Sequence, residues 1–331
     1  MKATAIASAN IALIKYWGKR DKKLILPQNS SISLTLDDLN TVTTIEFDKK
    51  YNQDTFILDG QEFKGGKELE GVVRHLNLIR EISGIGDKAK VVSKNNFLTA
   101  AGLASSASGF AALSLAATKA VGIDLDSKEL SILARRGSGS ATRSCLGGFV
   151  EWKKGEKGDG TDSFAVQLAK PEYWPEFRML TTIVSTVKKK VSSREGMAQT
   201  VKTSPMYKVW LDTIEEDLEK VRKGILEKDF TLVAKIAEIN CLKMHATMLT
   251  TRPSIIYWMP ATLEIIQAIL FWRKEGLESY FTIDAGPQVK VICLKKDVSE
   301  IEKKLQNIKG VKKIIICKPG QSPKLSQKHL F

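Results

Sequence analysis

Cysteine and histidine are scarce in this chain of 331 residues, which contains four of the first and three of the second. No two cysteines have the Cys-x-x-Cys spacing of a zinc site, and the histidines are far apart in the sequence. Neither a zinc site nor a disulfide framework is therefore expected. We predict buried thiols in a cytoplasmic protein. The cysteines are Cys145, Cys241, Cys293 and Cys317.

Long hydrophobic runs are also missing. The most apolar stretch, residues 255–272, is interrupted by a proline, a glutamate and a glutamine, so it predicts a packed amphipathic helix rather than a membrane span. The apolar segment 3–14 contains Asn10, is followed by Lys15 and has no clear cleavage region after it. We therefore expect this segment to be a strand of the mature protein, and we expect no membrane partner.

Acidic residues are outnumbered, with 37 against 51 lysines and arginines, which gives a net charge of +14. Such an excess suggests an anionic partner, namely nucleic acid, an anionic membrane surface or a phosphorylated small molecule, although a lysine-rich solvated surface has the same composition. Residues 286–331 alone carry 11 lysines and 3 acidic residues, a balance of 11 − 3 = +8. Aromatic residues make up only 7% and are not interleaved with the basic stretches, which argues against nucleic-acid binding.

The order of the expected elements divides the chain. Short strands alternate with turns in the first half, whereas long helices dominate from about residue 204 onward. This pattern predicts an α+β protein in which helices are segregated from an antiparallel sheet. We place a first domain at residues 1–183, a second at 184–318 and a basic tail at 319–331, which should be poorly ordered unless it docks on the body. The long helices are expected at residues 204–223, 229–249 and 261–275.

A segment rich in glycine, alanine and serine, residues 99–109, leads into an apolar helix. Such a loop at a helix N-terminus presents free backbone N–H groups and the positive end of the helix dipole, which suits a phosphate. Ser105, Ser106 and Ser108 add hydroxyl groups. No Gly-Lys-Ser/Thr follows, so this is not a Walker A loop. The alternative interpretation is a helix start capped by serines.

Three further segments carry groups that could bind or activate an anionic substrate. Ser138 and Ser140 flank a glycine shortly before Arg143, a pattern that could also be an ordinary connection between a helix and a strand. Lys15 and Lys19 flank an aromatic pair, which could equally be a basic hairpin surface. Asp284 follows an apolar strand and precedes Ala-Gly-Pro, where it is either a base at the rim of a sheet or part of an Asx turn.

Together these segments predict one site for phosphoryl transfer. A polyanionic substrate needs cations and hydroxyls, a nucleoside triphosphate needs a glycine-rich loop, and transfer to an alcohol needs a positioned carboxylate. Asp284 is the candidate carboxylate. The candidate cations are Lys15, Lys19, Arg143 and Arg194.

With these segments in this order, the sequence resembles the diphosphomevalonate decarboxylase family. This family lies within the superfamily of galactokinase, homoserine kinase, mevalonate kinase and phosphomevalonate kinase (GHMP kinases). The resemblance implies a two-lobed α+β fold, with an N-terminal lobe like domain 2 of ribosomal protein S5 and a ferredoxin-like C-terminal lobe. The active site would lie in the cleft between them, and a cytoplasmic homodimer that binds no nucleic acid is the family expectation. The matching blocks are residues 10–19, 26–36, 95–109, 137–148, 191–197, 244–249 and 282–287.

The implied activity is the ATP-dependent decarboxylation of mevalonate 5-diphosphate in isoprenoid biosynthesis. The enzyme would phosphorylate the tertiary 3-hydroxyl and then release phosphate and CO2, giving isopentenyl diphosphate and ADP. A 3-kinase of the same fold that does not decarboxylate is the alternative. Because such relatives lack parts of the Lys15, Arg143 and Asp284 set, the full reaction is favoured.

The resemblance also assigns roles to residues. Asp284 lies next to the 3-hydroxyl, and Arg143 holds the substrate carboxylate. Lys15 lies beside that carboxylate and Asp284. Substrate-binding residues are Ala12, Tyr16, Lys19, Ser138, Gly139, Ser140, Arg143, Ser193, Arg194 and Met197. Residues for the ATP phosphates are Gly102, Leu103, Ala104, Ser105, Ser106, Ala107, Ser108 and Lys188.

Magnesium would be held mainly by the ATP phosphates, with Ser106 as the one candidate protein ligand. Two positions depart from the family pattern: Leu98 replaces a common proline and Ser108 a common alanine. Both lie around the expected phosphate loop, and neither removes a proposed catalytic group.

Overall fold

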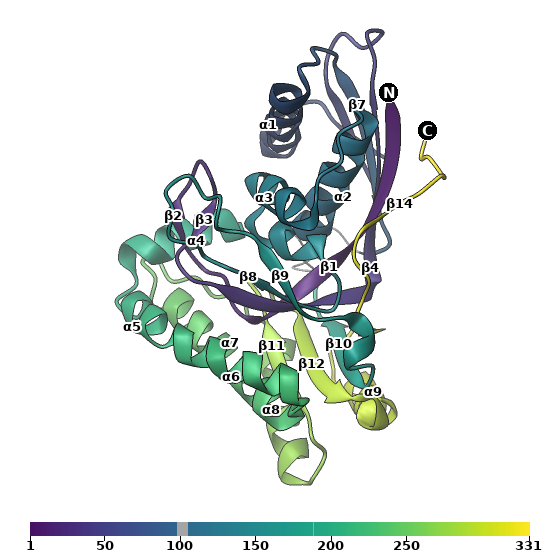
Figure 1. The fold of residues 1–331 in the computed structure, drawn as a ribbon. Helices are drawn as coiled ribbons and strands as arrows, with labels where there is room; N and C mark the ends of the chain where they lie inside the picture. Colours follow the sequence, from purple (N-terminus) through teal and green to yellow (C-terminus); the bar gives the residue numbers. More distant parts are fainter. Residues whose placement is uncertain (98–104, 188) are drawn as a thin grey trace.

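The computed structural model describes residues 1–97, 105–187 and 189–331 (Figure 1). Helices and strands form two lobes, each built on its own β-sheet, which agrees with the predicted α+β class. Within the described residues, no helix is both long enough and apolar enough to cross a bilayer.

The sheet of the first lobe has the strand order β14-β1-β4-β7-β5-β6, and β8 pairs with β4 and β9. Two long strands form its centre and pair antiparallel along most of their length. Both are largely buried because helices cover them on either side, which explains why most residues of the segment 3–14 are small or apolar. The strands are β1 (Lys2–Ile14), β4 (Ser31–Phe47), β5 (Thr55–Leu58), β6 (Gln61–Phe63), β7 (Ala89–Asn95), β8 (Phe149–Trp152), β9 (Ala165–Ala169) and β14 (Lys324–Leu325).

Helices α1 (Gly66–Ser83), α2 (Ser105–Ala120) and α3 (Ser127–Gly137) belong to this lobe. The buried face of α2 consists mainly of alanine, so the helix packs closely on β1 and β4. Asp126 caps α3, and its capping box with Glu129 explains why the helix begins where it does. A 3₁₀ helix, η1 (Gly139–Cys145), follows α3 directly. This arrangement brings the beginning of α2 and the end of α3 to the same side of the sheet.

The second lobe contains an antiparallel sheet with the strand order β11-β12-β10-β13. Successive residues of β10 face opposite sides, since Met179 clusters with residues of α6 and α7 while Leu180 clusters with residues of α8 and α9. The strands are β10 (Phe177–Ile183), β11 (Tyr280–Ile283), β12 (Val289–Leu294) and β13 (Lys313–Cys317). The helices are α4 (Ser193–Thr203), α5 (Tyr207–Asp212), α6 (Ile214–Glu227), α7 (Phe230–Leu249), α8 (Pro260–Lys274) and α9 (Val298–Gln306).

Two expectations about this lobe need correction. The helix predicted at residues 204–223 is divided into α5 and α6 at Thr213, whose hydroxyl donates to the carbonyl of Trp210 and so competes with regular helix bonding. The strand at residues 177–183, which the predicted boundary assigned to the first domain, pairs with β12 and β13 in the second sheet. By sheet membership the boundary lies before Phe177. A division into separately folding domains stays a prediction.

The C-terminal tail docks on the first lobe instead of forming a poorly ordered arm. Its strand β14 pairs antiparallel with the edge of β1, and the His329 ring lies 2.7 Å from the Thr4 hydroxyl. The ring of Phe331 receives the ammonium groups of Lys2 and Lys90 at 4.2 and 4.4 Å. The tail therefore covers a strand edge that would otherwise be open, and both termini lie close together in Figure 1.

One hydrophobic core joins the lobes. It contains apolar residues of β1 and β4 from the first lobe together with residues of α6, α7 and β10 from the second. The four cysteines, all among the described residues, are free and buried, as predicted. A shared core holds the facing surfaces of the two lobes in a defined relation, and the cleft between them is where the predicted site residues gather.

Candidate active site

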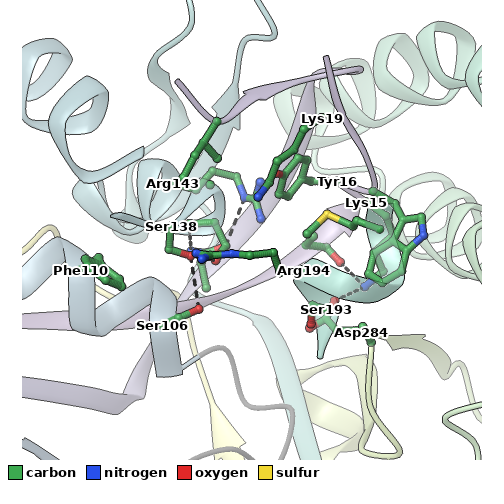
Figure 2. Close-up of a pocket in the computed structure, with 18 of the residues that line it drawn as sticks. Lys15, Tyr16, Lys19, Ser106, Phe110, Ser138, Arg143, Ser193, Arg194 and Asp284 are labelled. Carbon is green, nitrogen blue, oxygen red and sulfur yellow. Dashed lines mark hydrogen bonds and ion pairs between the residues drawn. The ribbon is translucent and has the colours of Figure 1, made fainter. Parts of the chain in front are cut away.

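A cavity of about 360 Å³ lies between the lobes, and all four predicted segments contribute to its wall (Figure 2). The end of β1, the start of α2 and the turn η1 come from the first lobe, while α4 and the loop after β11 come from the second. Its lining residues are Asn10, Ala12, Lys15, Tyr16, Trp17, Lys19, Ile25, Ser105, Ser106, Phe110, Gly137, Ser138, Gly139, Ser140, Arg143, Lys189, Ser193, Arg194, Met197, Met244, Asp284 and Ala285.

The carboxylate of Asp284 is held between two lysines. The Nζ atom of Lys15, which follows β1, donates to Oδ1 at 2.6 Å and to the carbonyl of Ala12 at 2.8 Å. The Nζ atom of Lys290, on β12, lies 3.5 Å from Oδ2. Both lysine side chains are 1% exposed, whereas that of Asp284 is 26% exposed. The carboxylate is therefore fixed from behind and open toward the cavity.

The charge state of this carboxylate follows from its neighbours. Burial alone raises the pKa of Asp284, but Lys15, Lys290 and Arg143 outweigh burial and hold the pKa well below its ordinary value. Asp284 is consequently ionised at any pH at which the protein would work. Burial lowers the pKa of Lys290, while the facing Asp284 raises it. The carboxylate therefore stabilises both lysine charges, which repel each other, in a region that is poorly accessible to water.

Arg143 is buried beside this cluster and is held by hydrogen bonds. Its Nε donates to Oδ1 of Asn10 at 3.1 Å, and its Nη1 donates to the Ser31 hydroxyl at 2.5 Å. Burial lowers the pKa of Arg143 to about 10, so the guanidinium stays charged near neutral pH. The amide of Asn10 donates in turn to the carbonyl of Ser140 and to the Ser144 hydroxyl. Arg143 is thus a rigid cation in the cavity wall.

Another part of the cavity wall is lined by cations and hydroxyl groups. Burial, followed by repulsion from Arg194, lowers the pKa of Lys19 to about 8. The hydroxyls of Ser138 and Ser140 lie 3.2 Å apart, and that of Ser106 lies 3.3 Å from Ser138. In Figure 2 the Arg194 side chain extends toward Ser138 and Ser106. Because Lys19 and Arg194 lie close enough to repel each other, they form a suitable site for an anion.

Lys189 supplies another cation from the loop before α4. Its Nζ donates to the Ser193 hydroxyl and to the carbonyl of Ala285, both at 2.7 Å. Burial lowers the pKa of Lys189 to about 8, although Asp284 raises it. These contacts tie α4 to the loop that carries the catalytic carboxylate candidate.

Tyr16 has a buried hydroxyl with no hydrogen-bond partner among the described residues. Its ring packs edge-on against Trp152 with the centroids 4.7 Å apart, which fixes the direction of the hydroxyl. A buried polar atom without a partner is uncommon in native proteins. A bound substrate oxygen would satisfy it, which fits the predicted substrate-binding role.

The predicted phosphate segment is only partly described. Ser105 and Ser106 line the cavity at the beginning of α2, where the helix dipole and free N–H groups favour a phosphate with its magnesium ion. In contrast, Ala107 and Ser108 are fully buried and are not among the lining residues, and the Ser108 hydroxyl lies 2.7 Å from that of Thr41 in the core. The Ser108 side chain is therefore directed away from the site. Gly102, Leu103, Ala104 and Lys188 lie outside the described residues, as does Leu98.

Every predicted catalytic and substrate-binding residue lies on the cavity wall, but their individual roles stay predictions. Sequence reasoning missed Lys290 as a partner of Asp284, although a lysine within an apolar strand six residues later was a usable signal. It also missed the apolar part of the wall. Trp17 and Met244 could have been found, because both fall within segments that match the family, residues 10–19 and 244–249. No sequence pattern around Ile25 or Phe110 indicates a place in the cavity wall.

Comparison with known proteins finds two family models that match the chain. A family model of the diphosphomevalonate decarboxylase-like N-terminal domain matches residues 7–165, and one of the mevalonate 5-diphosphate decarboxylase C-terminal domain matches residues 179–315. The chain is 41% identical to the diphosphomevalonate decarboxylase of Saccharomyces cerevisiae over 90% of its own length and 79% of the relative. It is 40% identical to the human diphosphomevalonate decarboxylase over 90% of its length and 78% of the relative.

Solved structures give the same result. Mevalonate diphosphate decarboxylase from Staphylococcus aureus matches with a TM-score of 0.93 and 40% identity over 98% of both chains. The enzyme from Enterococcus faecalis matches with a TM-score of 0.91 and 43% identity over 99% of both chains. A complex of MDDEF with MVAPP, AMPPCP and magnesium matches with a TM-score of 0.92 and 43% identity over 99% of both chains. The two-lobed α+β fold is therefore the one shared by these proteins.

Proposed function

The chain belongs to the diphosphomevalonate decarboxylase family, and from this premise we propose that it converts mevalonate 5-diphosphate and ATP into isopentenyl diphosphate, ADP, phosphate and CO2. This reaction belongs to the mevalonate pathway of isoprenoid biosynthesis. The observation that carries the proposal is the grouping of Lys15, Arg143 and Asp284 in one cavity with the N-terminus of α2. Such a grouping provides for both chemical steps, phosphorylation and decarboxylation.

The cavity has a suitable group for each charged part of the substrate. Lys19 and Arg194, with the serine hydroxyls, suit the diphosphate, because cations and hydroxyl donors are what a polyanion requires. Arg143 suits the substrate carboxylate, since a planar guanidinium can hold both of its oxygens. With both ends held, the 3-hydroxyl is directed toward Asp284. This positioning replaces a random encounter by a defined approach geometry.

The first step is phosphorylation of the 3-hydroxyl. A tertiary alcohol is too weak an acid to ionise before it reacts, and Asp284, whose pKa is held low, is a weak base in the resting enzyme. Asp284 therefore accepts a hydrogen bond that aligns the hydroxyl, and it takes the proton only as the new O–P bond forms. Lys15 maintains the carboxylate in the required orientation throughout.

The second step is loss of phosphate and CO2. Phosphate departs with the electrons of the C–O bond, so positive charge develops at C3 before the carboxylate is lost. Asp284 first passes the proton taken from the hydroxyl to an oxygen of the departing phosphate. Ionised again, it stabilises the positive charge, because it is preorganised close to the reacting carbon. Arg143 keeps the substrate carboxylate ionised and oriented until its C–C bond breaks. Because its pKa is held low, Asp284 readily gives up the proton and returns to the ionised form that this electrostatic role requires.

ATP and magnesium fit the start of α2. Ser105 and Ser106 present hydroxyls beside the helix N-terminus, which is the donor set that a magnesium-bound phosphate chain requires. When bound, Mg-ATP supplies the phosphoryl group. The serine hydroxyls and the backbone N–H groups of the helix orient its phosphates toward the cavity.

One assay tests the proposal. Purified protein is mixed with Mg-ATP and mevalonate 5-diphosphate, and ADP and CO2 are followed together, with Asp284→Asn as the inactive control. Equal amounts of both products are expected. ADP without CO2 would make the protein a 3-kinase. If neither product forms, mevalonate and its 5-phosphate are tested next, and turnover of either would replace the proposed substrate.

A cytoplasmic homodimer completes the proposal. Apolar side chains are exposed on α8 and in the segment before it, and such a surface suits burial against a second copy of the chain. Its exposed residues are Ile256, Met259, Leu263, Leu270 and Phe271. Light scattering should give the mass of a dimer, and Phe271→Glu should shift it toward a monomer.

The location in the cytoplasm is a separate point. Buried free thiols suit a reducing compartment, which cell fractionation would test.

A further inference from the structure

Lys290 occupies an unusual position for a lysine. It lies in β12, which is hydrogen-bonded to a strand on either side, and its residue exposure is 0%. Removing an ammonium group from water is costly unless an opposite charge compensates it. Oδ2 of Asp284 lies 3.5 Å from its Nζ, and Nζ also donates to the carbonyl of Gln288 at 3.2 Å. The compensating charge is therefore the carboxylate of the candidate active site.

The strand register explains why these two residues meet. Lys290 pairs with Thr282 across β11 and β12, so their side chains lie on the same face of the sheet. Asp284 follows two residues after Thr282 and continues on that face. A one-residue shift of the register would direct Lys290 to the opposite face. The juxtaposition is thus a product of this particular hairpin.

The two lysines hold different oxygens and come from different lobes. Lys15, after β1, approaches Oδ1, whereas Lys290, from the second sheet, approaches Oδ2. A carboxylate held at both oxygens cannot rotate about its Cβ–Cγ bond without losing a contact. The remaining exposed part of Asp284 faces the cavity.

We propose that Lys290 is a positioning residue for Asp284, acting with Lys15 to fix the plane of the catalytic carboxylate and to keep its charge compensated throughout turnover. The inference rests on the proposed function, in which Asp284 faces the 3-hydroxyl of the substrate. Lys290 itself is not among the residues lining the cavity, so its contribution to the reaction passes through Asp284.

A double-mutant cycle of Lys290→Met and Asp284→Asn tests this role. In the wild-type background, Lys290→Met should lower kcat by about tenfold and change KM by less than about threefold. In the Asp284→Asn background, the same substitution should cause no further loss in single-turnover rate, because the group through which it acts is gone. The variant Lys290→Arg should retain most of the wild-type kcat, since arginine keeps the positive charge.

Thermal unfolding of the same proteins provides a readout independent of the reaction. In the wild-type background, Lys290→Met should lower Tm, because Asp284 loses one of its two lysine partners. In the Asp284→Asn background, the same substitution should raise Tm, because it removes the repulsion between two buried ammonium groups. Lys290→Gln replaces Lys290→Met if the latter does not fold. Equal rate losses in both backgrounds, or a Tm that falls in both, would overturn the inference.

These results distinguish the inference from the proposed function. If the wild-type protein releases no CO2 from mevalonate 5-diphosphate, the proposed function fails. The opposite Tm changes would still establish the coupling of Lys290 to Asp284, and their absence would refute it.

Discussion

The ammonium of Lys15 lies 2.6 Å from Oδ1 of Asp284, although 269 positions separate the two residues in the sequence. One follows the first strand of the first lobe and the other follows a strand of the second. The contact therefore forms only when both lobes are folded and docked. It links the assembly of the fold directly to the assembly of the site.

Asp284→Asn should lower kcat by about 1,000-fold while ATP and substrate still bind, because an amide neither takes a proton nor stabilises positive charge at C3. Steady-state kinetics and calorimetric titration of both substrates check this. Asparagine is preferable to alanine because it preserves the side-chain volume between the two lysines. Loss of substrate binding with kcat intact at saturation would contradict the assignment.

Arg143→Lys should lower kcat/KM by about 100-fold, because a single ammonium cannot reach Asn10 and Ser31 while also holding both oxygens of a carboxylate. Arg135→Lys is a matched control, since Arg135 is equally buried but bonds backbone carbonyls away from the cavity. The control substitution should lower Tm and should change kcat/KM only slightly. A near-native kcat/KM for Arg143→Lys would refute the proposed carboxylate contact.

Activity should fall in mildly alkaline solution. Lys19 and Lys189 each have a pKa of about 8, so above that pH they lose the positive charge that attracts the phosphates. A profile of kcat/KM against pH should decline above about pH 8. Lys19→Arg should move the decline to higher pH, because arginine stays protonated. A wild-type profile that stays flat well above this pH would show that neither lysine controls binding.

Acid should destabilise the fold through His75. This ring is buried, lies 2.8 Å from the Ser114 hydroxyl, and has a pKa lowered to about 4, mainly by burial. Between the ordinary pKa of about 6.5 and this value, only the unfolded chain binds the proton, so stability decreases as pH falls through that range, by about 3 kcal/mol. Chemical denaturation at several pH values measures the loss. His75→Gln should reduce the slope, and an unchanged slope would point to other groups.

Removing the tail should affect stability and leave catalysis alone. Deleting residues 323–331 removes the pairing of β14 and both lysine contacts of Phe331, and it should lower the free energy of unfolding by about 2 kcal/mol. Replacing Lys324 and Lys328 by serine should leave kcat unchanged. A large fall in kcat after that replacement would mean that the tail contributes to the site or to a subunit interface.

Local sequence patterns predicted the elements and most of the candidate site, because each of those motifs lies within one short segment. Lys15, Arg143 and Asp284 could be named in this way. Lys290 was missed: its place within an apolar strand was a usable signal, but its contact with Asp284 depends on the register of a hairpin that pairs it with Thr282.

Long-range pairing accounts for the other misses. The sheet to which residues 177–183 belong is decided by partners more than a hundred positions away. The docking of the tail rests on a two-residue strand too short to produce a pattern, together with single contacts from His329 and Phe331. Ser108 was expected at the phosphates because it lies in the glycine- and serine-rich segment that opens a helix, but its place on the helix directs it to Thr41.

The chain passes between the two lobes twice, and both passages pack on Gly147 and Gly148. A Cβ atom on Gly148 would lie 2.2 Å from the carbonyl oxygen of Ala169, just before the outgoing passage, and one on Gly147 would lie 2.6 Å from the backbone N of Ser322 on the returning passage. The N–H of Gly148 also donates to the carbonyl of Gly320 at 2.9 Å. The two covalent connections between the lobes thus lie side by side at this glycine pair. A side chain at either glycine would therefore displace the backbone of a connecting segment, and with it the relation between the two lobes that form the cavity.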